Sequence, residues 1–212
     1  DGASIVRACD VLAAKVDGEL RAQLLEEAAA LLMDATDDDA AVEERLRAAL
    51  AIDPARPIAY SRLHDLLADR NDDAALLELV LSRIEVIDDP EALTPLFYEE
   101  ARLRRALGQR DEALAALESL FLLETDHVGG LALLVELHVQ REAWADAVAA
   151  LRQLAGADVP PQQKRIARLG AADFLERKLG DAEGALAELR VLVDLDLANR
   201  PIRERIATLT KR

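Results

Sequence analysis

The sequence predicts an all-α protein, on three observations. Its 212 residues are 51% hydrophobic but only 3% aromatic. Apolar residues that are mostly Ala and Leu, beside abundant Glu, Asp and Arg, are typical of long helices. Apolar residues also recur three and four positions apart, as at Val42, Leu46 and Ala49, which places them on one helical face. Gly and Pro fall between these periodic segments, and no stretch alternates apolar and polar residues as a strand would.

Residues that end and begin helices divide the chain into predicted elements. Gly18, Gly108 and Gly180 stand where helices are expected to stop, because glycine tolerates the left-handed backbone found there. Asp37-Asp38-Asp39 and Asn71-Asp72-Asp73 provide side-chain oxygens that cap the open amides of the next helix. The predicted helices number about twelve and span 3–17, 19–35, 38–52, 56–69, 72–88, 91–107, 110–124, 128–141, 144–156, 161–178, 181–197 and 201–210.

Prolines mark helix starts and junctions, where a missing amide proton costs little. Pro95 is the exception, because it lies in or just after the first turn of a helix that begins near residue 91. The alternative is a helix that begins closer to Thr94, with Thr94 as its cap. The prolines that do stand at starts or junctions are Pro54, Pro57, Pro90, Pro160, Pro161 and Pro201.

The predicted helices repeat in pairs. When the openings of alternate helices are aligned, equivalent residues fall at Val42, Leu76, Ala113, Ala147 and Ala185, with spacings of 34, 37, 34 and 38. Connections of two to five residues make neighbouring helices antiparallel. A two-helix unit cannot bury its apolar face alone, so successive units are expected to stack on one another.

Several segments then resemble the tetratricopeptide repeat family. The segments Gly108–Leu114, Gly180–Leu186 and Glu142–Val148 are similar to the family's turn and second-helix opening, and Arg47–Pro54 to its second-helix ending. The family's Trp and Leu-Gly pair in the first helix are mostly missing, and its Asp-Pro ending occurs once. The resemblance implies a right-handed superhelical stack, an α-solenoid, with a concave face lined mainly by the first helix of each pair.

The resemblance covers roughly residues 23 to 199. We find no flexible linker and expect a single domain over 1–212. Because the chain lacks an initiator Met, we also expect it to be a fragment of a longer protein. The predicted repeats are roughly 23–56, 57–90, 91–127, 128–162 and 163–199, with flanking helices at 3–17 and 201–210.

The net charge of −15 argues against nucleic acid and anionic membranes as partners, because both carry negative charge. This acidity has two interpretations, solubility or a preference for basic partners. No stretch has the 18 apolar residues of a membrane span, and no signal peptide is visible. The single Cys9 excludes an internal disulfide, and the cytoplasm is favoured without being established. The high Ala, Arg, Asp and Leu content is typical of a GC-rich bacterial genome.

No pattern predicts catalysis, a metal or a cofactor. His64, His127 and His138 have no second His or Cys at metal-ligand spacing, and Asp37-Asp38-Asp39 lacks the Gly and the distal Glu of a calcium loop. The serines lie in helical patterns without the strained turn of a nucleophile. Gly129-Gly130 is too short for a phosphate loop and indicates a turn or a close helix contact. We therefore expect a chain that is not an enzyme.

The predicted function is a non-catalytic scaffold that binds a peptide or helix of another protein in the concave groove. The alternatives are a structural or self-association segment, including a homodimer, and a helper domain of an enzyme or regulator. Some members of the family bind a C-terminal carboxylate through Lys and Asn of successive first helices; these are missing here. The candidate groove residues, chosen by helical phase, are Ser61, Arg62, Asp65, Tyr98, Arg102, Arg105, Leu133, Glu136, Gln140, Asp173 and Arg177. Among them Arg102 and Arg105 favour an acidic segment.

Overall fold

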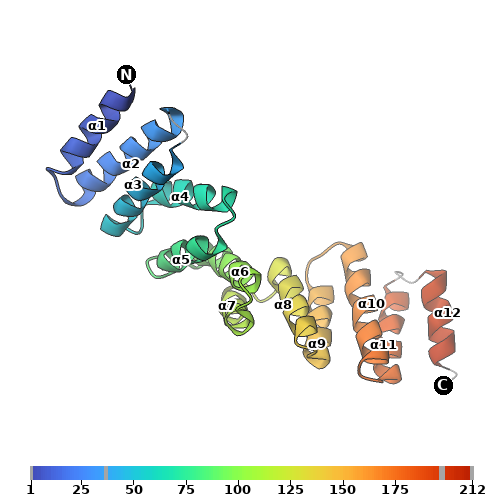
Figure 1. The fold of residues 1–212 in the computed structure, drawn as a ribbon. Coiled ribbons are helices and arrows are strands. Elements are labelled where there is room, and N and C mark those ends of the chain that lie inside the picture. The colour runs from blue at the N-terminus through green and yellow to red at the C-terminus, as the bar shows by residue number, and fades with distance from the viewer. Residues whose placement is uncertain (1, 36–37, 196–198, 211–212) are drawn as a thin grey trace. The chain divides into compact units, whose positions relative to one another are not determined.

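A computed structural model of the chain describes residues 2–35, 38–195 and 199–210. In these ranges the chain forms α-helices and no strand (Figure 1). The helices are α1 (Gly2–Ala13), α2 (Gly18–Ala35), α3 (Asp39–Ile52), α4 (Pro57–Asp69), α5 (Asp73–Ile84), α6 (Pro90–Ala106), α7 (Arg110–Leu123), α8 (Val128–Gln140), α9 (Trp144–Gly156), α10 (Pro161–Arg177), α11 (Ala182–Asp194) and α12 (Arg200–Leu209).

The helices group into two units, each with its own packing. Unit 1 runs from Asp1 to Gly108 and holds α1 to α6, while unit 2 runs from Gln109 to Arg212 and holds α7 to α12. Within each unit every helix packs against the one before and the one after it, as expected for stacked repeats. The limits of the five predicted repeats, and their grouping in one domain, remain predictions.

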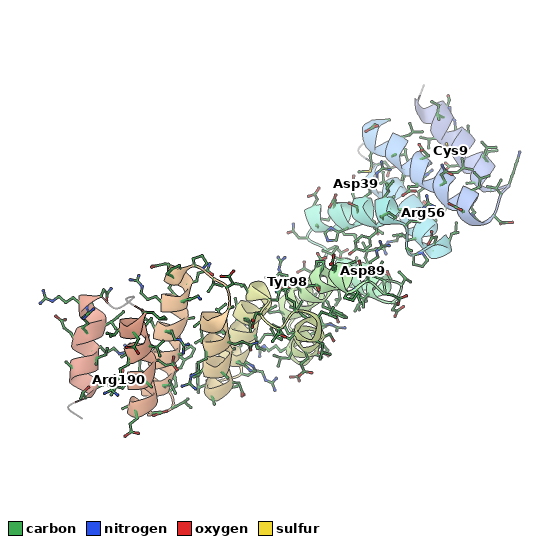
Figure 2. All side chains as sticks on the ribbon, turned by 180° about the vertical axis from the view of Figure 1, so that it is seen from behind. Cys9, Asp39, Arg56, Asp89, Tyr98 and Arg190 are labelled. Carbon is green, nitrogen blue, oxygen red and sulfur yellow. The ribbon has the colours of Figure 1, made fainter. Side chains whose placement is uncertain are left out.

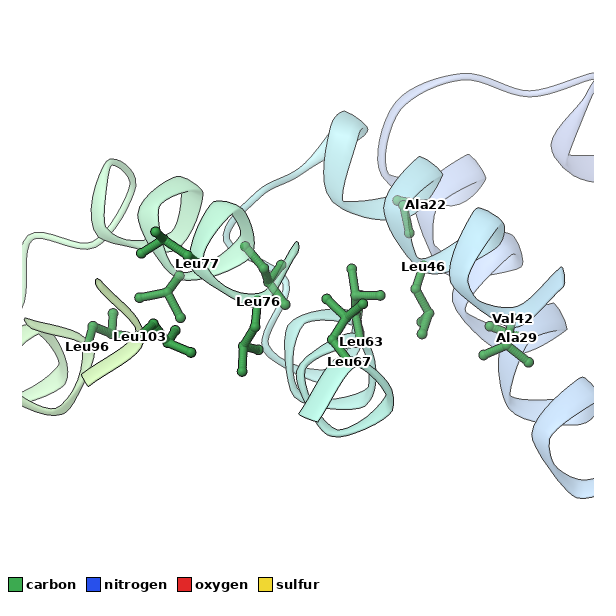
Figure 3. Packing of buried hydrophobic residues seen from close by; sticks show 14 residues of the cluster. Ala22, Ala29, Val42, Leu46, Leu63, Leu67, Leu76, Leu77, Leu96 and Leu103 are labelled. Carbon is green, nitrogen blue, oxygen red and sulfur yellow. The ribbon is translucent and has the colours of Figure 1, made fainter. Parts of the chain in front are cut away.

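Each unit has a core of leucines and alanines. In unit 1, Leu46 of α3 and Leu63 and Leu67 of α4 are buried together with Ala22 and Ala29 of α2 (Figure 3). Alanines at helix contacts allow the backbones to approach closely, and leucines fill the space between turns. The core of unit 2 has the same character and contains Ala167, Ala171, Ala185, Leu189 and Leu192.

Local sequence determines most helix ends as predicted. Asp38 and Asp72 accept hydrogen bonds from the amides of Ala41 and Ala75, each at 3.1 Å, so the predicted capping is confirmed there. Asp37 lies outside the described residues. Gly108 and Gly180 have φ of +76° and +68° at the ends of α6 and α10, a conformation that favours glycine.

The predicted alternative start of the sixth helix at Thr94 is wrong. α6 begins at Pro90, and its cap is Asp89, whose carboxylate accepts from the Glu91 amide at 3.3 Å. Pro95 lies inside the helix, exposed to solvent, so only one helical hydrogen bond on the outer side is lost. Asp89 at the cap and Pro90 as the first helical residue together fix the earlier start.

Three predicted helices are longer than the observed ones. α1 ends at Ala13 instead of residue 17, because Gly18 already opens α2 with φ +63° and the chain reverses direction between them. α5 ends at Ile84 instead of 88, because Asp89 and Pro90 start the next helix. α11 ends at Asp194, and the predicted extension to residue 197 reaches residues outside the described ranges.

Gly130 marks a close contact between α7 and α8, one of the two interpretations of Gly129-Gly130. A Cβ atom built on Gly130 would lie 2.6 Å from Leu120 Cδ2 and 3.1 Å from Phe121 Cε1. No side chain fits there without movement of these two residues. The glycine is therefore explained by helix packing.

Candidate functional site

The unit 1 candidates lie on α4 and α6, the first helices of two successive predicted pairs. Ser61 and Asp65 are exposed, while Arg62 is half-buried and its Nη1 donates to the backbone oxygen of Glu26 at 3.4 Å. Tyr98 is half-buried on α6 (Figure 2). The exposed Arg102 lies one turn later, with its guanidinium 5.9 Å from the centre of the Tyr98 ring, a cation–π contact.

A cavity of about 410 Å³ lies between these helices, and we call it the α4–α6 cleft. It brings the predicted Arg102 and Arg105 together, but its lining does not include Ser61, Arg62, Asp65 or Tyr98. The lining residues are His64, Ala68, Asp73, Leu76, Glu99, Arg102, Leu103, Arg105 and Ala106. The cleft therefore has apolar, acidic and basic parts.

His64 and Glu99 form an ion pair in this cleft that the sequence analysis did not predict. The Nε2 atom of His64 lies 2.7 Å from Glu99 Oε1, and its Nδ1 atom lies 3.4 Å from Asp65 Oδ1. Burial of the ring lowers the pKa of His64, but the hydrogen bond and charge of Glu99 outweigh burial and raise this pKa above its ordinary value. The spacing of 35 residues, close to one repeat, is the only sequence signal for the pair.

Tyr60 supports this pair from the preceding turn of α4. Its ring centre lies 5.9 Å from that of His64, and Arg83 of unit 1 lies 5.1 Å over the same tyrosine ring. Burial, with the charge of Glu99, raises the pKa of Tyr60 to about 12. The phenol therefore stays neutral around neutral pH, and the aromatic ring serves as a fixed wall behind His64.

The His64–Glu99 pair makes stability depend on pH. A histidine whose pKa is raised in the folded state stabilises that state fully below its unfolded pKa of about 6.5, and this contribution is lost as pH rises through the raised value. We expect Glu99→Gln to lower the free energy of unfolding by about 1 kcal/mol at pH 5.5 and by less at pH 8.5. Urea denaturation at both pH values measures this, with the exposed Glu78→Gln as control. An equal loss at both pH values would exclude the ion pair.

In unit 2, Leu133 was predicted as a groove residue, and this prediction is wrong. Leu133 is only 6% exposed and lies among the buried residues of α8, with Leu131 and Leu137. The reason is that α8 is apolar on nearly all sides, so its helical phase does not identify an outer face. Glu136 and Gln140 of the same helix are exposed, and Gln140 Nε2 donates to Glu136 Oε1 at 3.2 Å.

The two candidates on α10 differ in their availability. Asp173 Oδ1 lies 2.6 Å from Arg205 Nη1 of α12, and Glu176 Oε2 lies 2.7 Å from Arg205 Nη2. Asp173 is therefore already engaged in holding α10 to α12, which is a structural role. Arg177 is exposed at the end of α10. A binding role for Arg177, Glu136 and Gln140 remains a prediction.

An apolar groove in unit 2 lies nearer the beginning of these two first helices. Its volume is about 230 Å³, and Ile166 at its edge is 60% exposed. The sequence signal for it was an isoleucine within the polar stretch 162–168, which the helical-phase argument did not use. The groove is lined by Val128, Ala132, Leu151, Leu154, Gln163, Ile166 and Ala167.

Within the described ranges, no cluster of three or more His, Cys, Asp or Glu side chains could hold a metal ion. The helices found in the same ranges include none that is both long and apolar enough to cross a membrane.

Comparison with known proteins identifies the fold. No protein-family model matches the chain, and no curated protein matches it. Among solved structures, a tetratricopeptide repeat protein from Parabacteroides merdae is 21% identical, covers 89% of this chain and 72% of its own, and has a TM-score of 0.55. YrrB, also a tetratricopeptide repeat protein, is 16% identical over 89% of this chain and 91% of its own, with a TM-score of 0.54.

A third similar structure is the C-terminal part of a tetratricopeptide repeat-containing protein from Cytophaga hutchinsonii. It is 15% identical, covers 92% of this chain and 75% of its own, and has a TM-score of 0.59. At such identities the likeness establishes the fold. The prediction of an all-α solenoid is thereby confirmed, and the chain has the tetratricopeptide repeat fold.

Proposed function

We propose that this chain is a non-catalytic scaffold that binds a peptide or helix of another protein, and that the α4–α6 cleft is part of the binding surface. The observation that carries the proposal is the cleft itself, which is built by two successive first helices and has charged walls over an apolar floor. The similar protein YrrB is described as having an unusual peptide-binding site, and this supports the proposal by analogy.

Arg102 is the proposed contact for an acidic side chain of the partner. Its guanidinium is exposed, and within the described part of the chain it forms no ion pair. The contact with the Tyr98 ring limits its conformations, so less entropy is lost when it binds a carboxylate. An Arg–carboxylate pair can form two parallel hydrogen bonds, which gives geometric specificity in addition to charge attraction.

The floor of the cleft suits the apolar part of a partner segment. Leu76 and Leu103 are buried residues of the cleft wall, and Ala68 and Ala106 leave room above them. Burial of apolar atoms there would add affinity at about 25 cal/mol per Å². Asp73 and the paired Glu99 also line the cleft, so a segment with acidic residues throughout would be repelled at part of it.

The proposal of a non-catalytic role rests on the same lining. None of the nine lining residues carries a hydroxyl or thiol that His64 could activate as a nucleophile. The His64 ring is itself in contact with two carboxylates, those of Glu99 and Asp65. This arrangement orients the ring and suits a binding surface.

A displayed library of random peptides, selected on the immobilised 212-residue protein, tests the proposal. The best acidic binder is then measured by calorimetry against Arg102→Glu and against Arg190→Glu, a matched charge reversal at an exposed arginine of α11 (Figure 2). We expect Arg102→Glu to weaken binding by roughly 10-fold or more, since a charged hydrogen-bonded pair becomes a repulsion. Arg190→Glu should leave it unchanged. Selection of no peptide, or equal loss in both variants, would refute the α4–α6 cleft as the binding surface.

A second candidate function is favoured by a different surface. α1 exposes large apolar residues, which suits a structural or self-association role.

A further inference from the structure

The two sides of α1 differ from those expected of a terminal helix. Val6 and Ala13 are buried against unit 1, which holds α1 in place. Ile5 and Leu12 are each 51% exposed, and Ala8 between them is exposed as well. These three residues are three and four positions apart, so they form one apolar stripe along the helix. We call Ile5, Ala8 and Leu12 the α1 stripe.

The repeat period shows what this stripe corresponds to elsewhere in the chain. Ala8 and Leu12 lie 34 residues before Val42 and Leu46, the corresponding positions of α3. Both of those residues are buried, as are their equivalents in three further second helices. α1 therefore has the core-facing residues of a second helix but no first helix packed on them. The buried equivalents are Val42, Leu46, Leu76, Val80, Ala147, Leu151, Ala185 and Leu189.

The other end of the chain does not offer a complementary surface. The exposed side of α12 carries Arg203, Glu204 and Thr208, while its apolar Ile202 and Leu209 are buried. A polar outer face is what a terminal repeat needs for solubility. Docking of α1 onto α12 of another copy would bury these charges without partners, so an open head-to-tail chain is disfavoured.

We propose that the α1 stripe pairs with the α1 stripe of a second copy, in an antiparallel, two-fold symmetric dimer. With the symmetry axis beside Ala8, Ile5 of one copy packs against Leu12 of the other, and this contact occurs twice. The small Ala8 at the centre allows the two helix backbones to approach closely. Each helix then occupies the place that a first helix has in the other repeats.

The size of the stripe predicts how strong the dimer is. Val11 and Leu20, also about half exposed, extend the apolar surface around the stripe. One helix face is much less than the 20 to 30 residues a side of a standard stable interface, so we expect a dissociation constant on the order of 10 μM or weaker. Each copy carries a net charge of −15, so repulsion opposes association and added salt should strengthen it.

Sedimentation velocity over a concentration series from roughly 1 μM to 1 mM tests the dimer directly. We expect a reversible increase from the 23.1 kDa monomer toward twice that mass. Leu12→Glu should keep the protein monomeric over the whole range. The matched control is Leu122→Glu on α7, a leucine that is 87% exposed and outside the stripe, and it should associate like the original chain. Far-UV circular dichroism confirms that each variant is folded.

A charge exchange tests the antiparallel pairing itself. In the double variant Ile5→Lys with Leu12→Glu, each Lys faces a Glu of the other copy, so association lost in Leu12→Glu should return at low salt. A monomer at all concentrations would overturn the proposal, as would a dimer that persists in Leu12→Glu or is lost in Leu122→Glu. A double variant that stays monomeric would overturn the antiparallel pairing. Peptide binding at the α4–α6 cleft is measured separately, so failure of one proposal is distinguishable from failure of the other.

Discussion

Leu189→Ala is expected to lower the free energy of unfolding of unit 2 by about 3 kcal/mol, a change of more than 100-fold in its folding equilibrium. Leu189 of α11 is 0% exposed and belongs to the cluster formed by α9, α10, α11 and α12. Its truncation removes apolar contacts and leaves a cavity that helices held by short connections cannot fully close. The alanines around it, Ala171, Ala172 and Ala185, have no longer side chains to move into the space.

Urea denaturation followed by circular dichroism measures the size of this loss, and hydrogen exchange locates it. Because repeats contact only their neighbours, exchange should become faster in α10 to α12, while the amides of unit 1 keep their protection. Leu122→Ala, at a leucine that is 87% exposed, should change stability by less than about 0.5 kcal/mol. Equal effects of the two substitutions would contradict the packing described here.

The second large effect is expected at Glu188, which is buried and holds three helices together. Its Oε1 atom accepts from Arg152 Nε of α9 and its Oε2 atom from Arg168 Nη1 of α10, both at 2.6 Å. The Glu188 side chain is only 5% exposed, while those of Arg152 and Arg168 are 46% and 21% exposed. The carboxylate therefore depends on these two arginines for its hydrogen bonds, whereas Arg152 can return to solvent.

Arg168→Met is expected to lower the free energy of unfolding by about 2 kcal/mol, because it leaves the buried carboxylate with one partly exposed partner. The double variant Arg168→Met with Glu188→Leu should lose less than the sum of the single variants, because neither buried charge then remains. The control is Glu204→Gln on α12, whose bond to Arg200 is 2.7 Å long but whose partners are 62% and 90% exposed. It should cost less than about 0.5 kcal/mol. Strict additivity of the two single losses would mean that Glu188 and Arg168 do not interact.

The sequence predicted the elements of the fold better than the surface of the site. Asp38 and Asp72 were predicted as caps, because capping depends on residues within four positions of each other. The position of Leu133 depends on the rotation of α8 against its neighbours, and a helix that is apolar on most sides does not specify that rotation. The helical phase thus failed in α8 but identified the exposed Arg102 in α6, where polar residues separate the apolar ones.

Pairs between repeats were beyond what the sequence could provide. His64 and Glu99 are 35 residues apart, and Asp173 and Arg205 are 32 apart. Many acidic and basic residues share such spacings in a chain with 26 Lys and Arg and 41 Asp and Glu. Which of them meet is decided by small rotations of stacked helices, to which the repeat period is insensitive.

The sequence by itself therefore determined the helical class, most helix starts, the repeat period and the family resemblance. Each of these rests on interactions within one helix or between adjacent ones, which local residue patterns encode. Only the tertiary structure decided that Leu133 is buried, that Asp173 is held by Arg205, and that Arg102 lies in a cleft beside the His64–Glu99 pair. It also showed that Ile5 and Leu12 remain exposed where every other second helix examined in the chain is covered, because a residue's burial depends on what packs against it.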